Sequence, residues 1–350
     1  MNEHGTVLIT GAGGFIGGRV TEALHLGSPY DVRPNLRQWS SAARIGRFPL
    51  QPVLFDIMEP EAIRRGMEGV THVVHCAYGP PEVTIEGTRN MLEAAEDAGV
   101  ERFVHLSTVD VYDKELTGQI DEDAPRVVNG DRYGDMKVEA ENVCWEHQDR
   151  VPVTVLRPSI VYGPFSDLWT VSICNRLKSG RWGTLGECGE GMCNLVYIDD
   201  VVQAIRRALA LDEAVGKAFN VNGPEAITWN EYFQRLNDEL GRPELGEIDP
   251  TSTKLMAKLT QPVRSAAKLV LDNFEDEIMK LYSRFDVIKY LMKRTENTLK
   301  TTPTSSELNL FQRDATYSTD RARNLLRYEP EYGVQEGVSM SVKWLSHHGY

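Results

Sequence analysis

Tyr133 and Lys137 stand four residues apart in a stretch whose apolar residues have helical spacing. Residues at positions i and i+4 share one face of a helix, so the phenol and the ammonium group can converge. A nearby positive charge favours the phenolate, and we therefore expect Lys137 to lower the pKa of Tyr133. Such a tyrosine takes a proton from a hydroxyl or gives one to a carbonyl. Thr108, just after an expected strand, would hold the same oxygen. A surface contact without chemistry is the alternative interpretation.

A glycine-rich segment near the N-terminus predicts a second part of the site. The sequence TGAGGFIG, residues 10–17, follows an expected strand and opens an expected helix. In its GxxGxxG spacing, the first glycine permits a tight turn, the second lets the backbone approach a diphosphate, and the third lets helix and strand pack closely. The helix N-terminus adds N–H groups and the positive end of the helix dipole. The expected cofactor-binding residues of this loop are Gly11, Gly14, Phe15, Ile16 and Gly17.

A dinucleotide held by this loop would turn the Tyr133/Lys137 pair into a site for hydride transfer at a secondary alcohol carbon. A glycine-rich turn without a ligand is the alternative. The choice of cofactor is expected after the second strand, where NAD enzymes place an Asp or Glu for the ribose hydroxyls. Here Asp31 comes at the start of that strand and Arg37 follows its end. An Arg suits a 2′-phosphate, so the sequence favours NADP over NAD, although Arg37 could also be a solvated surface residue.

The acid after the third strand has two interpretations. Asp56 and Ile57 could meet the adenine edge of the cofactor, or Asp56 could cap the next helix.

These side chains need a scaffold, and the first 160 residues indicate one. Short apolar runs rich in β-branched residues alternate with segments of helical spacing. The expected strands are residues 6–10, 53–55, 73–76, 103–106 and 153–156, and the expected helices are residues 17–26, 61–67, 83–98 and 133–148. This alternation predicts an α/β fold, a doubly wound parallel sheet with helices on both faces that binds ligands at the carboxyl ends of its strands.

The pattern loosens after Arg157-Pro158, where loops rich in Gly and Pro alternate with helices. We expect a dinucleotide-binding domain over 1–165 and a smaller, mostly helical substrate-binding lobe over 166–350, with the chain re-entering the first domain near 193–222. Residues 251–300 have helical periodicity and carry ten Lys or Arg against six Asp or Glu, which predicts a helical insertion. Its basic face could lie on a membrane surface. We expect it instead to be core or an oligomer contact.

Composition limits the classes of function. The chain has 350 residues and a net charge of −13, which argues against a nucleic-acid partner. It has no run of about 18 apolar residues, and its N-terminus lacks the basic and apolar regions of a secretory signal. Five cysteines without metal-site spacing indicate reduced thiols and no metal. We therefore expect a cytoplasmic homodimer with a small-molecule substrate.

Together the motifs resemble the extended short-chain dehydrogenase/reductases of the NAD-dependent epimerase/dehydratase family. The matching pieces are the glycine loop, HCA at 75–77, GTRN at 87–90, RFVHLST at 102–108, VY at 111–112, Tyr133/Lys137, RPSIVYGP at 157–164 and YIDDV at 197–201. The resemblance covers about residues 5–240 and 313–345. It implies a Rossmann-type domain and a catalytic triad of Thr108, Tyr133 and Lys137. It also implies cofactor contacts from Ala77, Pro158 and Ile160, with the Pro158 turn near the nicotinamide.

Departures from the family pattern bear on the substrate. Thr84 stands where members usually have an Asn, and the loop between Ala77 and Gly87 is short. Members that act on sugar nucleotides often have an Arg near the position of Cys193 and an Asn at that of Ser159. Sugar 4,6-dehydratases follow the catalytic Thr with Asp-Glu, so that reaction is not expected here. Asp110 is then either an auxiliary acid or a structural carboxylate.

Three functions remain open. The first is an NADP(H)-dependent oxidoreductase of a secondary alcohol or ketone, similar to the hydroxysteroid dehydrogenase and dihydroflavonol reductase branch. Arg37, Ser159 and the missing diphosphate-binding Arg favour it. The second is a nucleotide-sugar epimerase or sugar ketoreductase with tightly bound NAD(P), in which Arg313 could meet the diphosphate. The third is a non-catalytic dinucleotide sensor, which the intact Thr/Tyr/Lys set disfavours.

Overall fold

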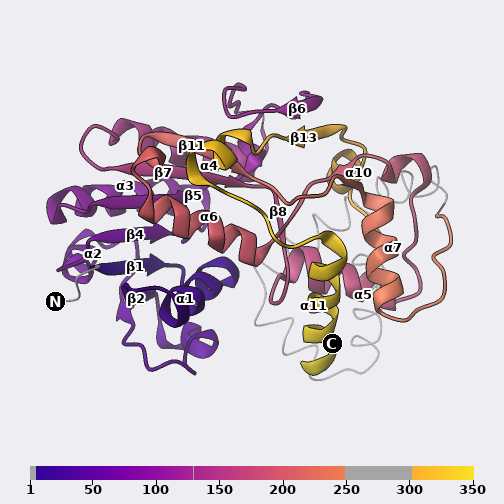
Figure 1. Cartoon of the computed structure of the whole chain (residues 1–350), viewed down its shortest axis with the longest axis horizontal. Coiled ribbons are helices and arrows are strands. Elements are labelled where there is room, and N and C mark those ends of the chain that lie inside the picture. The colour runs from indigo at the N-terminus through magenta and orange to yellow at the C-terminus, as the bar shows by residue number, and fades with distance from the viewer. Residues whose placement is uncertain (1–4, 129, 249–301) are drawn as a thin grey trace, which may run out of the picture. The chain divides into compact units, whose positions relative to one another are not determined.

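The computed structural model describes residues 5–128, 130–248 and 302–350 (Figure 1). The helical insertion expected over 251–300 lies outside the described residues. The chain forms two compact units. The first comprises Met1–Ser166, Asn194–Glu225 and Ala315–Gly337, and the second comprises Asp167–Cys193, Ala226–Asp314 and Val338–Tyr350. Residues 315–337 thus return to the first unit, a second return that the sequence analysis does not predict.

The first unit is built on a seven-stranded sheet in the order β11-β7-β5-β4-β1-β2-β3. Each neighbouring pair is parallel, so the predicted doubly wound parallel sheet of the Rossmann type is confirmed. Its strands are β1 (Thr6–Thr10), β2 (Asp31–Leu36), β3 (Val53–Leu54), β4 (His72–His75), β5 (Arg102–Leu106), β7 (Val153–Pro158) and β11 (Lys217–Val221). The chain runs outward in opposite directions from β1 and β4, and such a switch point is where sheets of this kind bind their ligands.

Helices cover this sheet. They are α1 (Phe15–Gly27), α2 (Pro60–Met67), α3 (Pro81–Ala98), α4 (Arg132–Glu146) and α6 (Ile198–Ala210). One group, α2 to α4, buries apolar side chains against β4, β5 and β7 in a shared core that includes Met91, Phe103 and Val143. The helices α1 and α6 pack on each other, and α6 crosses in front of the sheet in Figure 1. The predicted helices therefore occur within two residues of their expected starts and ends.

Short strands complete the first unit. The strand β10 (Leu195–Tyr197) pairs in parallel with β8 (Ile160–Tyr162), and β13 (Ala315–Tyr317) pairs in parallel with β6 (Gly118–Ile120). Single turns of 3-10 or π type are η1 (Trp39–Arg44), η2 (Val109–Val111), η5 (Asp212–Ala214) and η6 (Ala322–Leu326). The pairing of β13 joins segments almost 200 residues apart, and no local sequence pattern could have predicted it.

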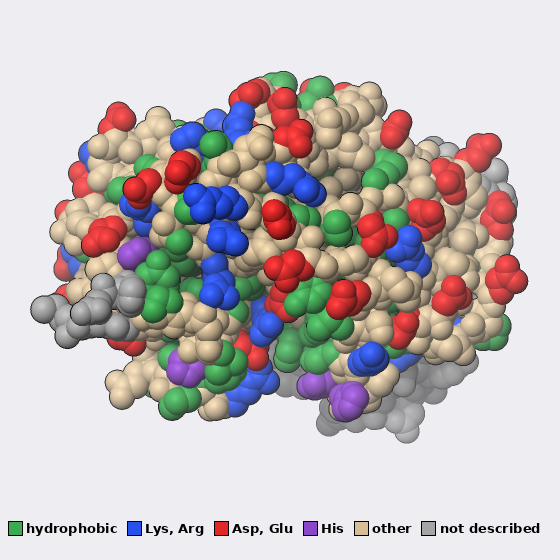
Figure 2. Space-filling model, in the orientation of Figure 1, with side chains coloured by type: hydrophobic (Ala, Val, Ile, Leu, Met, Phe, Trp, Pro, Cys, Tyr) green, Lys and Arg blue, Asp and Glu red, His purple; other side chains and the backbone are tan. Residues whose placement is uncertain are grey.

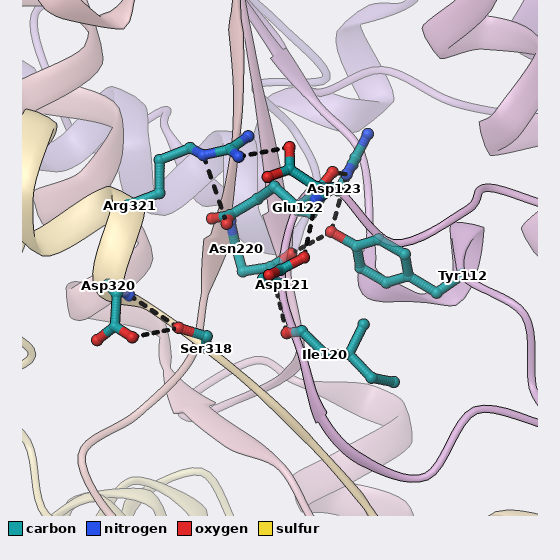
Figure 3. Close-up of polar contacts among 10 residues, drawn as sticks. Tyr112, Ile120, Asp121, Glu122, Asp123, Asn220, Ser318, Asp320 and Arg321 are labelled. Carbon is teal, nitrogen blue, oxygen red and sulfur yellow. Dashed lines mark hydrogen bonds and ion pairs between the residues drawn. The ribbon is translucent and has the colours of Figure 1, made fainter.

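Polar contacts hold this late return against the rest of the unit (Figure 3). Arg321 donates to Asp123, with 2.6 Å between Nη2 and Oδ1, and its Nε lies 3.7 Å from Oε2 of Glu122. Glu122 in turn accepts from the backbone N of Asn220 at 2.8 Å, and the side chain of Asn220 accepts from the Tyr112 hydroxyl at 2.7 Å. Burial raises the pKa of Glu122. Segments from three parts of the chain therefore meet in one network, buried around Glu122 and Asn220 and exposed at Asp123.

The two carboxylates of the YIDD motif also join distant segments of the first unit. Asp199 forms a two-point ion pair with Arg19 of α1, with Nε–Oδ1 at 2.5 Å and Nη2–Oδ2 at 3.0 Å. Asp200 accepts from the backbone N–H groups of Glu331 at 2.7 Å and Tyr332 at 3.4 Å. Asp199 therefore joins α6 to α1, and Asp200 joins α6 to the 315–337 segment.

The second unit is mainly helical. It contains η3 (Asp167–Val171), α5 (Ser172–Lys178), η4 (Gly186–Gly189), α7 (Trp229–Glu239), α10 (Ser305–Phe311), most of α11 (Val334–His347) and the antiparallel pair β9 (Met192–Cys193) and β12 (Ile227–Thr228). Aromatic residues form its core, with the rings of Trp229 and Phe311 centred 4.5 Å apart and Phe233 against both. Capping boxes begin α7 at Thr228 and α10 at Thr304.

Acidic side chains are distributed over the face shown in Figure 2 and are interspersed with basic ones, as the net charge of −13 leads one to expect. Among the helices of the described residues, none combines the length and the apolar content needed to cross a membrane.

Candidate active site

The loop between β1 and α1 has space only for glycine at two of its predicted positions. Gly11 has φ +68, and a Cβ there would lie 3.0 Å from the backbone N of Ala77. A Cβ at Gly17 would collide with the carbonyl of Gly11. The N–H of Gly14 donates to that same carbonyl at 2.9 Å and closes the turn. The loop therefore brings backbone close to backbone, as a diphosphate-binding turn requires.

The start of α1 is open to an anion. Gly14 is its N-cap, and Phe15 and Ile16 are its first residues. Within the described chain, no side chain caps this end, and the first turn carries no acidic residue. Helices leave their first N–H groups without intrahelical partners and carry partial positive charge at this end. These residues fit a dinucleotide diphosphate.

Thr108, Tyr133 and Lys137 come together at the carboxyl end of β5. Thr108 caps η2, and its hydroxyl is hydrogen-bonded to that of Tyr133. Lys137 is buried on α4, and its Nζ donates to the carbonyl of Leu106 at 2.9 Å. Asp131 caps α4 and accepts from the backbone of Tyr133 at 3.3 Å. Because β1 and β5 are parallel strands of one sheet, the three side chains lie at the same edge as the glycine loop.

In the chain without a cofactor, the expectation that Lys137 lowers the pKa of Tyr133 is wrong. The pKa of Tyr133 is raised, chiefly because its hydroxyl loses solvent and then because Asp110 and Tyr78 oppose the phenolate. The hydrogen bond from Thr108 acts in the other direction. Lys137 is directed at a carbonyl instead, and burial lowers its own pKa to about 8. Tyr133 is therefore a protonated acid near neutral pH, and forming a phenolate requires additional positive charge in the site.

The next helical turn of α4 carries a residue that sequence reasoning missed. Glu141 is fully buried and accepts from Arg157 at 3.0 and 2.7 Å, which makes a two-point pair. It also accepts from Ser107 at 2.5 Å and from Arg126 at 3.2 Å. Glu141 stands four residues after Lys137, so the two share one helix face, and this spacing could have indicated its place near the site. The Glu141–Arg157 ion pair fixes α4 against β7. The contact of Glu141 with Ser107 holds the residue that precedes Thr108.

A second missed residue, Tyr78, follows β4. Its ring is centred 6.3 Å from that of Tyr133 in an edge-to-face arrangement, and Nζ of Lys137 lies 5.6 Å from its centroid. Tyr78 is 65% exposed. The nearby His75 is buried and bonded to Thr10 at 2.8 Å, and burial lowers its pKa to about 3. The imidazole is thus neutral, and Lys137 carries the positive charge at this point.

The other predicted cofactor residues are spread along the same edge. Arg37 is exposed directly after β2. Asp56 accepts from the backbone N of Met58 at 3.0 Å, which is a local turn contact and not the helix cap given as its alternative, because Glu59 is the N-cap of α2; Ile57 is buried. A missed residue, Arg44, donates to the carbonyl of Gly14 at 3.2 Å and lies 4.1 Å above the ring of Phe165. Burial lowers the pKa of Arg44 to about 10.

The turn after β7 is held by hydrogen bonds of the two residues that follow Pro158. Ser159 donates its hydroxyl to Asn222 at 2.7 Å and its backbone N–H to Val221 at 3.0 Å. The N–H of Ile160 donates to the carbonyl of Asn194 at 2.9 Å. The resemblance would lead one to expect an Asn at this position. The Ser159 found there makes a structural hydrogen bond instead.

Comparison with known proteins identifies the family. The model of the NAD dependent epimerase/dehydratase family matches residues 7–222. The chain belongs to this family. The resemblance drawn from the motifs is thus confirmed.

Relatives of this epimerase/dehydratase-family protein include both redox and epimerising enzymes. It is 24% identical over 328 residues to 3beta-hydroxysteroid-dehydrogenase/decarboxylase isoform 1 of Arabidopsis thaliana, covering 87% of this chain and 69% of that one. It is 28% identical over 262 residues to UDP-glucose 4-epimerase of Vibrio cholerae, covering 68% and 76%. A crystal structure of UDP-glucuronic acid 4-epimerase from Bacillus cereus in complex with NAD superposes with a TM-score of 0.72 at 19% identity, over 98% of this chain and 97% of that one. That similarity concerns the fold.

Proposed function

We propose that this protein is an NAD(P)-dependent oxidoreductase that transfers a hydride between nicotinamide and the carbon of a secondary alcohol or ketone. The observation that carries the proposal is the hydrogen-bonded pair Thr108 and Tyr133 beside Lys137, at the edge of the sheet that holds the glycine loop. Two hydroxyls that share one hydrogen bond can both reach a single substrate oxygen. A relative named as a hydroxysteroid dehydrogenase/decarboxylase supports the redox interpretation.

Each residue has a distinct role in this proposal. Thr108 orients the substrate oxygen, and Tyr133 moves the proton on or off it as general acid or base. Lys137 supplies positive charge that favours the phenolate once its ammonium turns from the Leu106 carbonyl to the reacting end of the site. The bound nicotinamide gives or accepts the hydride. The backbone around Gly14 and the start of α1 bind the diphosphate.

We also propose NADP(H) as the preferred cofactor. Arg37 is exposed at the end of β2, where a 2′-phosphate would lie, and no acid occupies that position. Arg44 adds a second guanidinium whose Nη1 is 3.2 Å from the Gly14 carbonyl, on the same loop. Among the described residues, its Nε is buried without a hydrogen-bond partner. Two cations here favour a phosphate over free ribose hydroxyls.

The second candidate is a nucleotide-sugar epimerase, favoured by the Vibrio cholerae relative. Three positions argue against it: Thr84 bonds within its own loop, Ser159 bonds Asn222, and Cys193 is buried. Arg313, the candidate for a sugar diphosphate, lies in the second unit, where its carbonyl accepts from the N–H of Met192 at 2.8 Å.

Absorbance at 340 nm tests the proposal. Purified protein with NADP⁺ or NAD⁺ and a panel of secondary alcohols that includes 3β-hydroxysteroids should produce reduced cofactor. Tyr133→Phe should lower kcat by about 10²–10⁴-fold while the Kd for NADPH stays within about twofold, because the hydroxyl acts only in proton transfer. Net interconversion of UDP-glucose and UDP-galactose without a change in absorbance, together with strong heat protection by a UDP-sugar, would reject the proposal in favour of the epimerase.

A further inference from the structure

The inference concerns Tyr78, an exposed aromatic residue beside the reacting hydroxyl. Its ring meets that of Tyr133 edge to face, with an angle of 76° and 6.3 Å between centroids. With 65% of its surface exposed, Tyr78 is among the most exposed large apolar side chains of the described residues. An apolar ring left in solvent next to the candidate general acid is a surface that a substrate would cover.

The loop that carries Tyr78 is fixed on both sides. Before it, the N–H of Ala77 donates to the Thr10 hydroxyl at 3.2 Å. After it, Thr84 both accepts from the N–H of Gly79 and donates to the carbonyl of Gly79, each at 3.0 Å. The helix α3 then begins at once, with Pro81 as its first residue. The backbone of Tyr78 is therefore held in place by the short connection that sets this chain apart from the family pattern.

The same hydrogen bonds limit what this loop can offer to a ligand. The Thr84 side chain stands where the family pattern has an Asn, and its hydroxyl is used within the loop. The neighbouring Gly79 has no side chain, and Pro80 and Pro81 have no N–H to donate. The loop therefore presents mainly an aromatic ring. A sugar with several hydroxyls would find few partners there, whereas an apolar ring system would bury surface at little polar cost.

Tyr78 also contacts the lysine of the pair. Nζ of Lys137 lies 5.6 Å from the centroid of its ring, within the range of a cation–π contact. The ring thus touches both Tyr133 and Lys137. This places it at the reacting end of the site, beside the side chains proposed to handle the substrate oxygen.

We propose that Tyr78 determines substrate specificity: its ring forms an aromatic surface on which the ring of a flat, largely apolar alicyclic secondary alcohol lies while Tyr133 and Thr108 hold the hydroxyl. This inference rests on the proposed oxidoreductase function and names its substrate class. Tyr78 takes no part in proton or hydride transfer.

Steady-state kinetics with two probe alcohols test the inference. One probe is a flat 3β-hydroxysteroid, and the other is 2-butanol, which is too small to cover the ring. Tyr78→Ala should lower kcat/KM for the steroid by roughly tenfold or more, mostly through KM, and should change kcat/KM for 2-butanol less than about twofold. Tyr78→Phe should retain the steroid activity because it keeps the ring. Tyr30→Ala is the matched control, since Tyr30 directly precedes β2 at the opposite edge of the sheet.

The outcomes separate this inference from the proposed function. Equal losses for both alcohols in Tyr78→Ala, no loss for either, or failure of the wild-type protein to oxidise the steroid while it oxidises other secondary alcohols would each overturn the role of Tyr78 and leave the oxidoreductase intact. No reduction of cofactor with any secondary alcohol would overturn the oxidoreductase and this inference with it. The Kd for NADPH and the melting temperature of Tyr78→Ala, both expected to match wild type, exclude a folding defect as the cause of a selective loss.

Discussion

Replacing Glu141 with alanine should destabilise the protein more than any surface change on the same helix. Glu141 is fully buried, and its partner Arg157 is 3% exposed. The substitution removes both oxygens from Arg157 and the acceptor for Ser107, whose hydroxyl lies 2.5 Å away. The guanidinium of Arg157 keeps its contacts with the Tyr112 hydroxyl at 2.8 Å and with the carbonyl of Glu122 at 3.4 Å, but neither acceptor carries the charge of the lost carboxylate.

The magnitude follows from this geometry. Removing one member of a buried ion pair leaves an uncompensated charge and costs about 3–5 kcal/mol of the free energy of unfolding. A loss of that size corresponds to a melting temperature lower by roughly 6–20 °C in a domain of 150–250 residues. Glu141→Gln keeps an acceptor and much of the volume, so its effect should fall between wild type and alanine.

Thermal unfolding followed by circular dichroism measures the effect, with Glu139→Ala as the matched control. Glu139 lies on the same helix and has the same charge, but it is exposed. Its replacement should change the free energy of unfolding by less than about 0.5 kcal/mol. If Glu141→Ala melts within 2–3 °C of Glu139→Ala, a difference that corresponds to about 1 kcal/mol, the buried pair does not stabilise α4 in the way we have argued.

Three further predictions concern the cofactor and the pH dependence. Gly17→Ala should abolish the thermal stabilisation that NADPH gives, because its Cβ would collide with the Gly11 carbonyl; stabilisation equal to wild type would contradict the glycine-loop assignment. Arg37→Glu together with Arg44→Ala should weaken NADPH relative to NADH by about tenfold or more in fluorescence titrations, and an unchanged ratio would remove the case for NADP. Burial raises the pKa of Asp200 to about 6 from an ordinary value near 4, so the folded state holds a proton there that the unfolded state releases. The free energy of unfolding should therefore fall as pH rises from about 4 to 6 and then level off, and Asp200→Asn should flatten that slope in urea titrations; an equal slope would refute it.

The sequence predicted those parts of the molecule that depend on neighbouring residues. The glycine spacing of the first loop, the alternation of strands and helices, and the i and i+4 placement of Tyr133 and Lys137 are all local patterns. The helices α1 to α4 begin within two residues of the expected starts. The predicted site residues consequently lie along one edge of the sheet, although their roles stay predictions, as do the homodimer and the cytoplasmic location.

What the sequence could not predict depends on contacts between distant segments. The pKa of Tyr133 is raised chiefly by burial and then by Asp110 and Tyr78, which come from other elements, and Lys137 is directed at the carbonyl of Leu106. No helical period indicates either fact. The position of Tyr78 likewise depends on hydrogen bonds within its loop. The sequence shows that this loop is short, but it does not show the path of the backbone.

The first unit is built from three separate segments of the chain, and this affects how it folds while the protein is synthesised. The last segment of that unit, Ala315–Gly337, follows its preceding segment only after some ninety residues, since that one ends at Glu225. Until this segment leaves the ribosome, β6 lacks its partner strand, and Asp200 lacks the N–H groups of Glu331 and Tyr332. The dinucleotide-binding unit therefore cannot complete its fold before residue 337 is available, and an N-terminal fragment that stops before residue 315 is expected to be an incomplete binder however intact its glycine loop is.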